Sequence, residues 1–192
     1  MNIRLISGAL KNHKITAPNS RQTHPMSERI RGAIFNSIQA YVPDARILDA
    51  FAGTGALGLE ALSRGASSVI FIEKNRLAQK ILAENLQIIN KANLNSSAKL
   101  IRSSISGWLN STAKQFTLGE IPSLPTFDLI FADPPYYDPQ FPTIERLVDR
   151  LEPDGILVLS QPASLEDFSH PQLLRLNAKT YSAARIIIFK KK

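Results

Sequence analysis

The sequence lacks cysteine altogether and contains only three histidines, two methionines and one tryptophan in 192 residues. Without cysteine there can be no disulfide framework and no thiolate zinc site, which fits a reducing compartment. The three histidines, His13, His24 and His170, lie far apart in the chain, so a histidine-based metal site is not expected. We therefore predict a cytoplasmic protein without a bound metal.

Long apolar runs are also absent. No stretch approaches the roughly 20 apolar residues that a membrane-spanning helix needs, and the N-terminal MNIRLISGALKNHK lacks the apolar segment of a secretory signal. With 44% hydrophobic and 20% charged residues, the composition is typical of an ordinary globular protein with no membrane partner. No pattern indicates an oligomer, so we expect a monomer.

Acidic residues are fewer than basic ones, and the formal net charge is +7. This balance favours partners that carry phosphate, through long-range attraction and counterion release, although a basic protein without such a partner has the same composition. The chain ends in three lysines, and its first forty residues hold one acid, Glu28. The basic residues of this first segment are Arg4, Lys11, Lys14, Arg21, Arg29 and Arg31. A basic flank beside the main domain is therefore predicted.

The N-terminal segment differs in pattern from the rest of the chain. Two short strands and an amphipathic helix are predicted, over residues 3–8, 13–18 and 27–42. Ser27 is the candidate N-cap of the helix, and Pro43 marks a boundary after it. We therefore predict a basic N-terminal extension over 1–43 and a main domain over 44–192.

Strands and helices alternate from residue 46 onward. Strands are predicted over 46–52, 67–73, 98–103, 127–133 and 155–161, helices over 56–65, 76–90, around Trp108 and over 143–153, and a surface loop over 117–126. The tail from 173 offers two further strands as a closing hairpin. This alternation predicts an α/β fold with a mostly parallel, seven-stranded sheet, helices on both faces and ligands at the carboxyl ends of the strands.

The stretch DAFAGTGALG, residues 49–58, joins the first of these strands to a helix. Gly53, Gly55 and Gly58 have GxGxxG spacing, and glycine permits a tight turn that a ligand can approach closely. The spacing alone also fits dinucleotide binding, or a strand-to-helix turn with no ligand. Glu73 ends the next strand, where an acid can accept hydrogen bonds from ribose hydroxyls, as it would in a nicotinamide enzyme.

A second motif ends the strand predicted over 127–133, in FDLIFADPPYYDP. Prolines can end a strand because they lack the N–H that a ladder needs, but that does not explain an acid before them and tyrosines after them. DAFAGTG followed by DPPY resembles the Rossmann-like S-adenosyl-L-methionine-dependent amino methyltransferases, whose second motif reads [N/D/S]-P-P-[Y/F/W]. A dehydrogenase would leave DPPYY unexplained.

The chemistry of an amino nitrogen explains the residue types of the second motif. Such a nitrogen is a poor nucleophile because its lone pair is delocalised into the ring of the base. Asp133 can accept one of its N–H bonds and the backbone carbonyl of Pro134, held by Pro135, the other, which aims the lone pair at the methyl group. Tyr136 can stack on a flipped base. The alternative is a proline-terminated strand with locally packed tyrosines.

The wider sequence resembles one family. RLISG, HPMSERIRGAIFN, ILDAFAGTGALGLEALSRGA, DLIFADPPY and SAARIIIF are similar to segments of the RsmD family, bacterial methyltransferases of guanine N2 in 16S ribosomal RNA, at nucleotide 966. The resemblance covers nearly the whole chain. It implies a class I methyltransferase fold, the same reaction on the small ribosomal subunit, and an N-terminal extension that faces RNA.

The resemblance also implies a set of cofactor contacts: the glycine loop, two residues beside the ribose, two beside the adenine and an arginine near cofactor and RNA. They are Asp49, Phe51, Ala52, Gly53, Thr54, Gly55, Ala56, Leu57, Glu73, Lys74, Ser104, Ile105 and Arg29. The chain departs from the family at Asn12, where a basic pair is common, and at His24-Pro25-Met26, where RPT is common. Ser104 replaces the usual Asp or Asn. These departures leave open which residues contact the adenine and the RNA.

Four alternatives remain. A DNA adenine or cytosine methyltransferase usually carries a target-recognition insertion, for which this chain has little room. A protein-glutamine methyltransferase would typically have Asn at position 133. A non-catalytic RNA module that binds the cofactor is disfavoured by the intact DPPY, and a dehydrogenase requires that DPPY be accidental.

Overall fold

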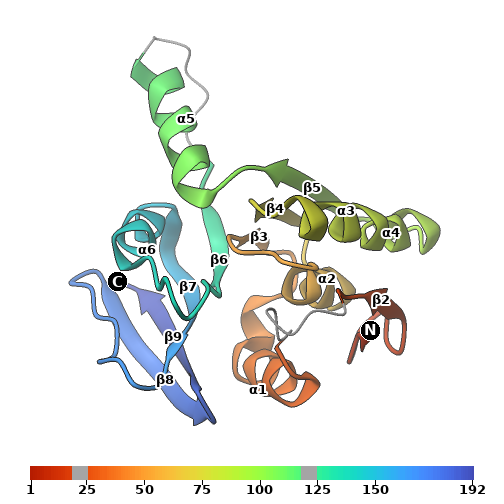
Figure 1. Cartoon of the computed structure of the whole chain (residues 1–192), viewed down its shortest axis with the longest axis horizontal. Helices are drawn as coiled ribbons and strands as arrows, with labels where there is room; N and C mark the ends of the chain where they lie inside the picture. Colours follow the sequence, from red (N-terminus) through yellow and green to blue (C-terminus); the bar gives the residue numbers. More distant parts are fainter. Residues whose placement is uncertain (19–25, 118–124) are drawn as a thin grey trace.

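A computed structural model of the chain describes residues 1–18, 26–117 and 125–192. Its centre is a seven-stranded sheet in the order β5-β4-β3-β6-β7-β9-β8 (Figure 1). Arg21, His24 and Pro25, and most of the loop predicted over 117–126, lie outside the described residues.

The sheet has five parallel strands and an antiparallel end. Its strands are β3 (Arg46–Asp49), β4 (Ser68–Glu73), β5 (Ser97–Arg102), β6 (Phe127–Ala132), β7 (Leu151–Pro162), β8 (Leu173–Tyr181) and β9 (Ala184–Lys191). The first five pair in parallel, and β9 pairs antiparallel with both β7 and β8. The central strands are continuous apolar runs because helices cover both faces of a parallel sheet. The predicted α/β architecture and closing hairpin are confirmed.

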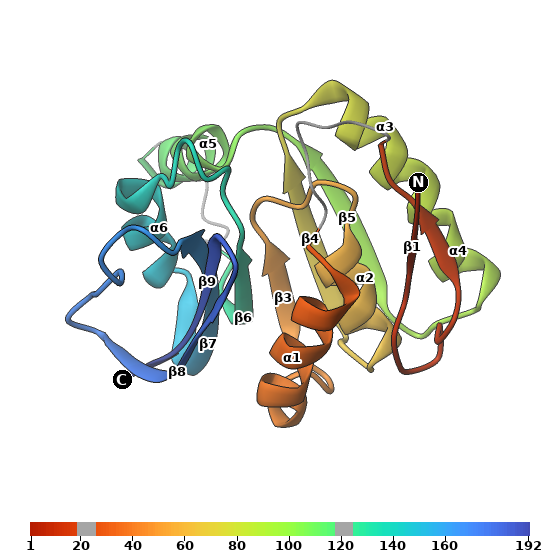
Figure 2. The same cartoon turned by 60° about the horizontal axis from the view of Figure 1, so that its bottom comes forward.

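Helices cover the two faces of this sheet (Figure 2). They are α1 (Glu28–Ile38) with the 3-10 turn Gln39–Tyr41, α2 (Ala56–Ser63), α3 (Arg76–Asn85), α4 (Gln87–Lys91), α5 (Ile105–Thr117) and α6 (Phe141–Val148). One apolar cluster packs the helices α1, α2, α3 and α4 against the sheet, and a second contains Trp108 of α5 and Ile144 of α6. Among the described helices, none is long and apolar enough to cross a membrane.

Two helix predictions are wrong in extent. The helix expected over 76–90 is divided at Leu86, where Ile89 N–H bonds to the Leu86 carbonyl in a tighter turn. The helix expected over 143–153 ends at Val148, because Leu151 already pairs with Phe127 as the first residue of β7. Both differences arise from contacts that helical periodicity does not encode.

The two predicted N-terminal strands, β1 (Asn2–Arg4) and β2 (Lys14–Thr16), pair as a hairpin that lies beside α3 and α4 (Figure 2). Its apolar residues Ile3 and Ile15 belong to the same cluster as α2 and α3. The buried carboxylate of Glu60 on α2 accepts N–H bonds from residues 6 and 7, at 2.7 and 3.1 Å. The extension is thus anchored on the main domain, and the boundary at residue 43 stays a prediction.

Ser27 caps α1, and Arg31 ties this helix to the hairpin. Ser27 caps the helix as predicted, accepting the Ile30 N–H at 3.3 Å. Arg31, expected in the exposed basic flank, is 1% exposed, and its guanidinium donates to the carbonyls of Met26 and Arg4 at 2.9 and 2.7 Å. The flank prediction is therefore wrong for Arg31, which has a structural position.

Candidate active site

Three carboxylates lie at the carboxyl ends of neighbouring strands of the sheet. Asp49 ends β3, Glu73 ends β4, and Asp133 directly follows β6. Because β4, β3 and β6 are parallel neighbours, their carboxyl ends lie side by side (Figure 1). This is the edge at which open α/β sheets bind ligands, so the structure brings the two sequence motifs together.

The glycine loop between β3 and α2 is held across the strand ends. Ala52 N–H bonds to the Ile72 carbonyl at 3.0 Å, and Gly53 N–H bonds to the Glu73 carboxylate at 2.7 Å. Gly53 and Gly55 have φ of 54° and 82°, a region that favours glycine. The loop conformation therefore requires these residues.

The three glycines have different surroundings. A Cβ on Gly55 would lie 2.4 Å from a methyl carbon of Leu82, and one on Gly58 would lie 2.2 Å from the Phe71 ring. Both positions are closed by packing between α2, α3 and β4. A Cβ on Gly53 would meet nothing within 4 Å, so this backbone faces open space in which a ligand can lie.

Asp49 is buried beneath the loop, with 2% of its surface exposed. Its carboxylate accepts the Gly58 N–H at 3.0 Å. Burial raises the pKa of Asp49 to about 7, with smaller contributions from the nearby charges of Asp133 and Glu73, while the Gly58 hydrogen bond opposes the rise. A positive ligand group at this edge would favour the ionised carboxylate.

Glu73 is fixed by two backbone hydrogen bonds. One carboxylate oxygen accepts the Gly53 N–H at 2.7 Å and the other accepts the Asn75 N–H at 2.6 Å. Each oxygen retains a free lone pair, so the carboxylate can accept hydroxyl donors from a ligand beside the loop. Lys74, the next residue, is exposed.

Asp133 and the two prolines form the second half of the site. Burial raises the pKa of Asp133 to about 6, and a hydrogen bond with Ser160 opposes that rise. The Pro135 carbonyl accepts the Asp138 N–H at 2.8 Å. No donor among the described residues bonds to the Pro134 carbonyl, so this oxygen and the Asp133 carboxylate can serve as paired acceptors for a ligand.

Ser160 on β7 is a site residue that sequence reasoning missed. Ser160 is 2% exposed, and its hydroxyl lies 3.0 Å from the Tyr136 hydroxyl. Either hydroxyl can donate in this contact, and Ser160 also interacts with the Asp133 carboxylate, where it opposes the rise in pKa. Ser160 therefore links Asp133 to Tyr136, which remains 40% exposed.

The other predicted cofactor residues occupy varied positions. Thr54 and Ala52 are buried in the loop, Phe51 and Ala56 are partly exposed, and Leu57 packs in the apolar core. The Ser104 hydroxyl accepts the Gly107 N–H at 3.1 Å and so caps α5, while Ile105 is buried. Arg29 is exposed on α1, and no hydrogen bond among the described residues joins it to the strand ends. Their roles toward a cofactor stay predictions.

The described side chains include no group of three or more His, Cys, Asp or Glu residues that could hold a metal ion.

Comparisons with known proteins agree with this geometry. The family described as Conserved hypothetical protein 95 matches residues 3–190. YlbH of Bacillus subtilis (strain 168) is 31% identical over 99% of this chain and 100% of its own length. Ribosomal RNA small subunit methyltransferase D of Escherichia coli (strain K12) is 33% identical over 81% of this chain and 69% of its own length.

Solved structures share the fold. The Escherichia coli protein yhhF, provisionally titled a methyltransferase, superposes with a TM-score of 0.83 at 24% identity, covering 100% of this chain and 99% of its own. The hypothetical protein TTHA0928 of Thermus thermophilus superposes with a TM-score of 0.75 at 26% identity, covering 97% and 98%. The expected Rossmann-like class I methyltransferase fold is confirmed.

Proposed function

Since the chain belongs to the Conserved hypothetical protein 95 family, we propose that it is an S-adenosyl-L-methionine-dependent rRNA methyltransferase. Its proposed substrate is the exocyclic N2 of a guanine in 16S rRNA of the small ribosomal subunit, at position 966. Two relatives support the choice of rRNA. The Escherichia coli protein is named a ribosomal RNA small subunit methyltransferase, and YlbH is provisionally named an rRNA methyltransferase.

One observation carries the proposal. The Asp133 carboxylate and the Pro134 carbonyl belong to neighbouring residues, and neither accepts a hydrogen bond from a backbone N–H of the described residues. Tyr136, two residues further on, is 40% exposed. Two acceptors next to a stacking surface match an amino group on a flat base, which has two N–H bonds to donate.

The residues at the strand ends fit S-adenosyl-L-methionine. Gly53 faces open space, Glu73 has free lone pairs for ribose hydroxyls, and Asp49 carries a raised pKa that a cationic ligand would lower. The cofactor, when bound, supplies a methyl group activated by a positively charged sulfur. Asp49, Glu73 and the glycine loop from 50 to 57 would hold it, with Lys74, Ser104 and Ile105 along its adenosine end.

The remaining chemistry belongs to Asp133 to Tyr136. Tyr136 stacks on the flipped guanine, and Asp133 and the Pro134 carbonyl accept the two N–H bonds of its amino group. Pro135 restricts the backbone so that this carbonyl keeps its direction. After methyl transfer the nitrogen carries an extra proton, which the ionised Asp133 can take up and release to water.

A second class of substrate has weaker support. A DNA adenine or cytosine amino group offers the same two N–H bonds, so the DPPY geometry alone does not exclude it. The rRNA relatives favour RNA from the small subunit, whereas the basic charge of +7 suits either nucleic acid. A cytoplasmic monomer remains our expectation for its state.

The test is methyl transfer from labelled S-adenosyl-L-methionine to small ribosomal subunits that lack the modification, followed by nucleoside digestion. We expect a labelled N2-methylguanosine peak. Label on adenine or cytosine would retain the methyltransferase and reject the guanine substrate. No transfer to any ribosomal or DNA substrate, with cofactor bound, would reject the proposal.

A further inference from the structure

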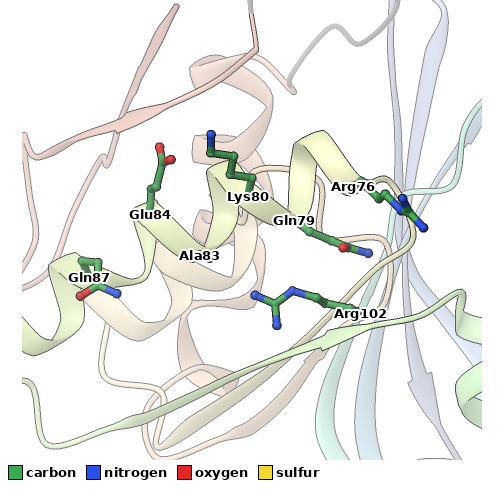
Figure 3. A pocket seen from close by; sticks show the side chains of 7 residues that line it. All are labelled: Arg76, Gln79, Lys80, Ala83, Glu84, Gln87 and Arg102. Carbon is green, nitrogen blue, oxygen red and sulfur yellow. The ribbon is translucent and has the colours of Figure 1, made fainter.

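A groove of about 400 Å³ lies along α3 and the end of β5. Figure 3 shows Gln79 and Arg102 pointing into the space between the helix and the strand, with Arg76 at the N-terminal end of the helix. The groove shares no lining residue with the candidate active site. Because β5 is the outer strand of the sheet, the groove opens at the edge of the molecule.

The charges of the groove are unbalanced. Arg76, Lys80 and Arg102 line it, with Glu84 as its single acid. All three cations are exposed, and none forms an ion pair within the described residues. Several other arginines are neutralised, Arg4 by Glu28, Arg46 by Asp128 and Glu152, and Arg175 and Arg185 by Asp167, whereas exposed Arg29 and Arg146 also form no ion pair among the described residues. The groove therefore holds cations that are free to bind an anion.

The groove adjoins the cofactor end of the site. Arg102 pairs directly with Glu73 in the register of β5 and β4. The Gln79 side chain donates to the Glu73 carbonyl at 2.8 Å, so a groove residue and the proposed ribose residue are held together. Lys74, the residue after Glu73, is a further exposed cation.

We propose that this groove binds backbone phosphates of the RNA whose guanine is methylated, an inference that rests on the proposed function. Arginine and lysine are the side chains that bind phosphate, and such contacts position a nucleic acid without reading its sequence. The groove strand β5 lies three strands from β6, about 14 Å at the usual strand spacing. One RNA segment can therefore place its base at Asp133 and its neighbouring phosphates at Arg102.

The test uses the variant Lys80→Gln/Arg102→Gln. The control is Lys179→Gln, which replaces an exposed lysine on the opposite edge strand β8 that forms no ion pair with any described residue. RNA affinity is measured from about 50 to 200 mM KCl, on the labelled 16S rRNA or small subunit that the wild-type protein methylates. We expect the double variant to raise Kd about tenfold at ~0.1 M salt and to reduce the slope of log K against log salt by roughly 0.7–0.9 per lost contact. Lys179→Gln should change neither.

Calorimetry with S-adenosyl-L-methionine and competition by AMP separate the other outcomes. The inference holds if the double variant keeps wild-type cofactor affinity and AMP does not displace the RNA. It fails, with the proposed function intact, if the wild type methylates RNA and the double variant binds it like Lys179→Gln. Equal loss of cofactor affinity, or displacement of RNA by stoichiometric AMP, would also overturn it. A wild type that neither binds nor methylates rRNA would overturn the proposed function itself.

Discussion

The two ends of the parallel strands treat their charges in opposite ways. At the amino end, Arg46 on β3 donates to Asp128 on β6 at 2.9 Å and to Glu152 on β7 at 2.8 Å. The Arg46 hydrogen bond lowers the pKa of Asp128, and bonds from Thr126 and Arg46 lower that of Glu152. These acids are ionised and paired in the absence of any ligand.

At the carboxyl end the acids lack such partners. Burial raises the pKa of Asp49 to about 7 and that of Asp133 to about 6. Neither they nor Glu73 form an ion pair in the part of the chain that the structure describes. At the amino end each of these acids already has an ion-pair partner, whereas a positively charged ligand would stabilise the ionised acids at the carboxyl end. This difference indicates that the carboxyl end is the functional one.

Replacing Asp133, at the carboxyl end, should have the largest effect on methyl transfer. We expect Asp133→Ala to lower kcat for methyl transfer by about 10²–10³, because one of two preorganised acceptors is lost. Cofactor affinity should remain near that of the wild type, because Asp49, Glu73 and the glycine loop, which would hold the cofactor, are unchanged. Steady-state kinetics and calorimetry with S-adenosyl-L-methionine measure the two quantities.

The matched control is Asp138→Ala, which replaces an exposed acid five residues further along whose side chain accepts a hydrogen bond from Gln140 and from no other described residue. It should leave kcat unchanged. Full activity in Asp133→Ala would remove this carboxylate from the mechanism.

Replacing Ser160 should have an intermediate effect that depends on pH. Asp133 must be ionised to accept an amino N–H, so the rate should fall as pH drops through about 6. Ser160 opposes the rise in the pKa of Asp133, so Ser160→Ala should move this acidic limb to higher pH and lower kcat on the limb, roughly tenfold for each pH unit that the limb moves. Ser160→Thr retains the hydroxyl and should restore the limb. A lower rate with an unmoved limb would assign Ser160 a packing role only.

The sequence predicted the fold where local pattern and tertiary contact agree. The apolar runs that become β3, β4 and β6 are buried on both faces, so composition alone identifies them. The same reasoning extended the last main helix too far, because the pairing of Leu151 with Phe127 is a contact between distant residues. Arg31 was misassigned for a related reason: its burial depends on the hairpin carbonyl of Arg4, which helical periodicity does not show.

The candidate site was predictable as far as its residues are adjacent in sequence. DPPY and the glycine loop are short motifs whose spacing carries their chemistry, and the structure brings them to one edge of the sheet. Ser160 lies 24 residues after Tyr136, inside a strand whose pattern indicates only burial. The register of β6 and β7 brings it to the motif, and that register is fixed by folding.

Breaking the amino-end network should have the smallest effect. Arg46→Gln removes both ion pairs, but its side chain is 50% exposed, and surface pairs contribute little to stability. We expect the midpoint of thermal unfolding at pH 7 to fall by at most about 2–4 °C, with kcat unchanged. Because the pKa values of Asp128 and Glu152 are lowered, their contribution is present above the unfolded pKa and disappears as both protonate. The difference in unfolding midpoint between variant and wild type should therefore shrink as pH falls below about 4. An unchanged difference there, or a loss of methyl transfer at pH 7, would contradict the separation between a structural and a functional end of the sheet.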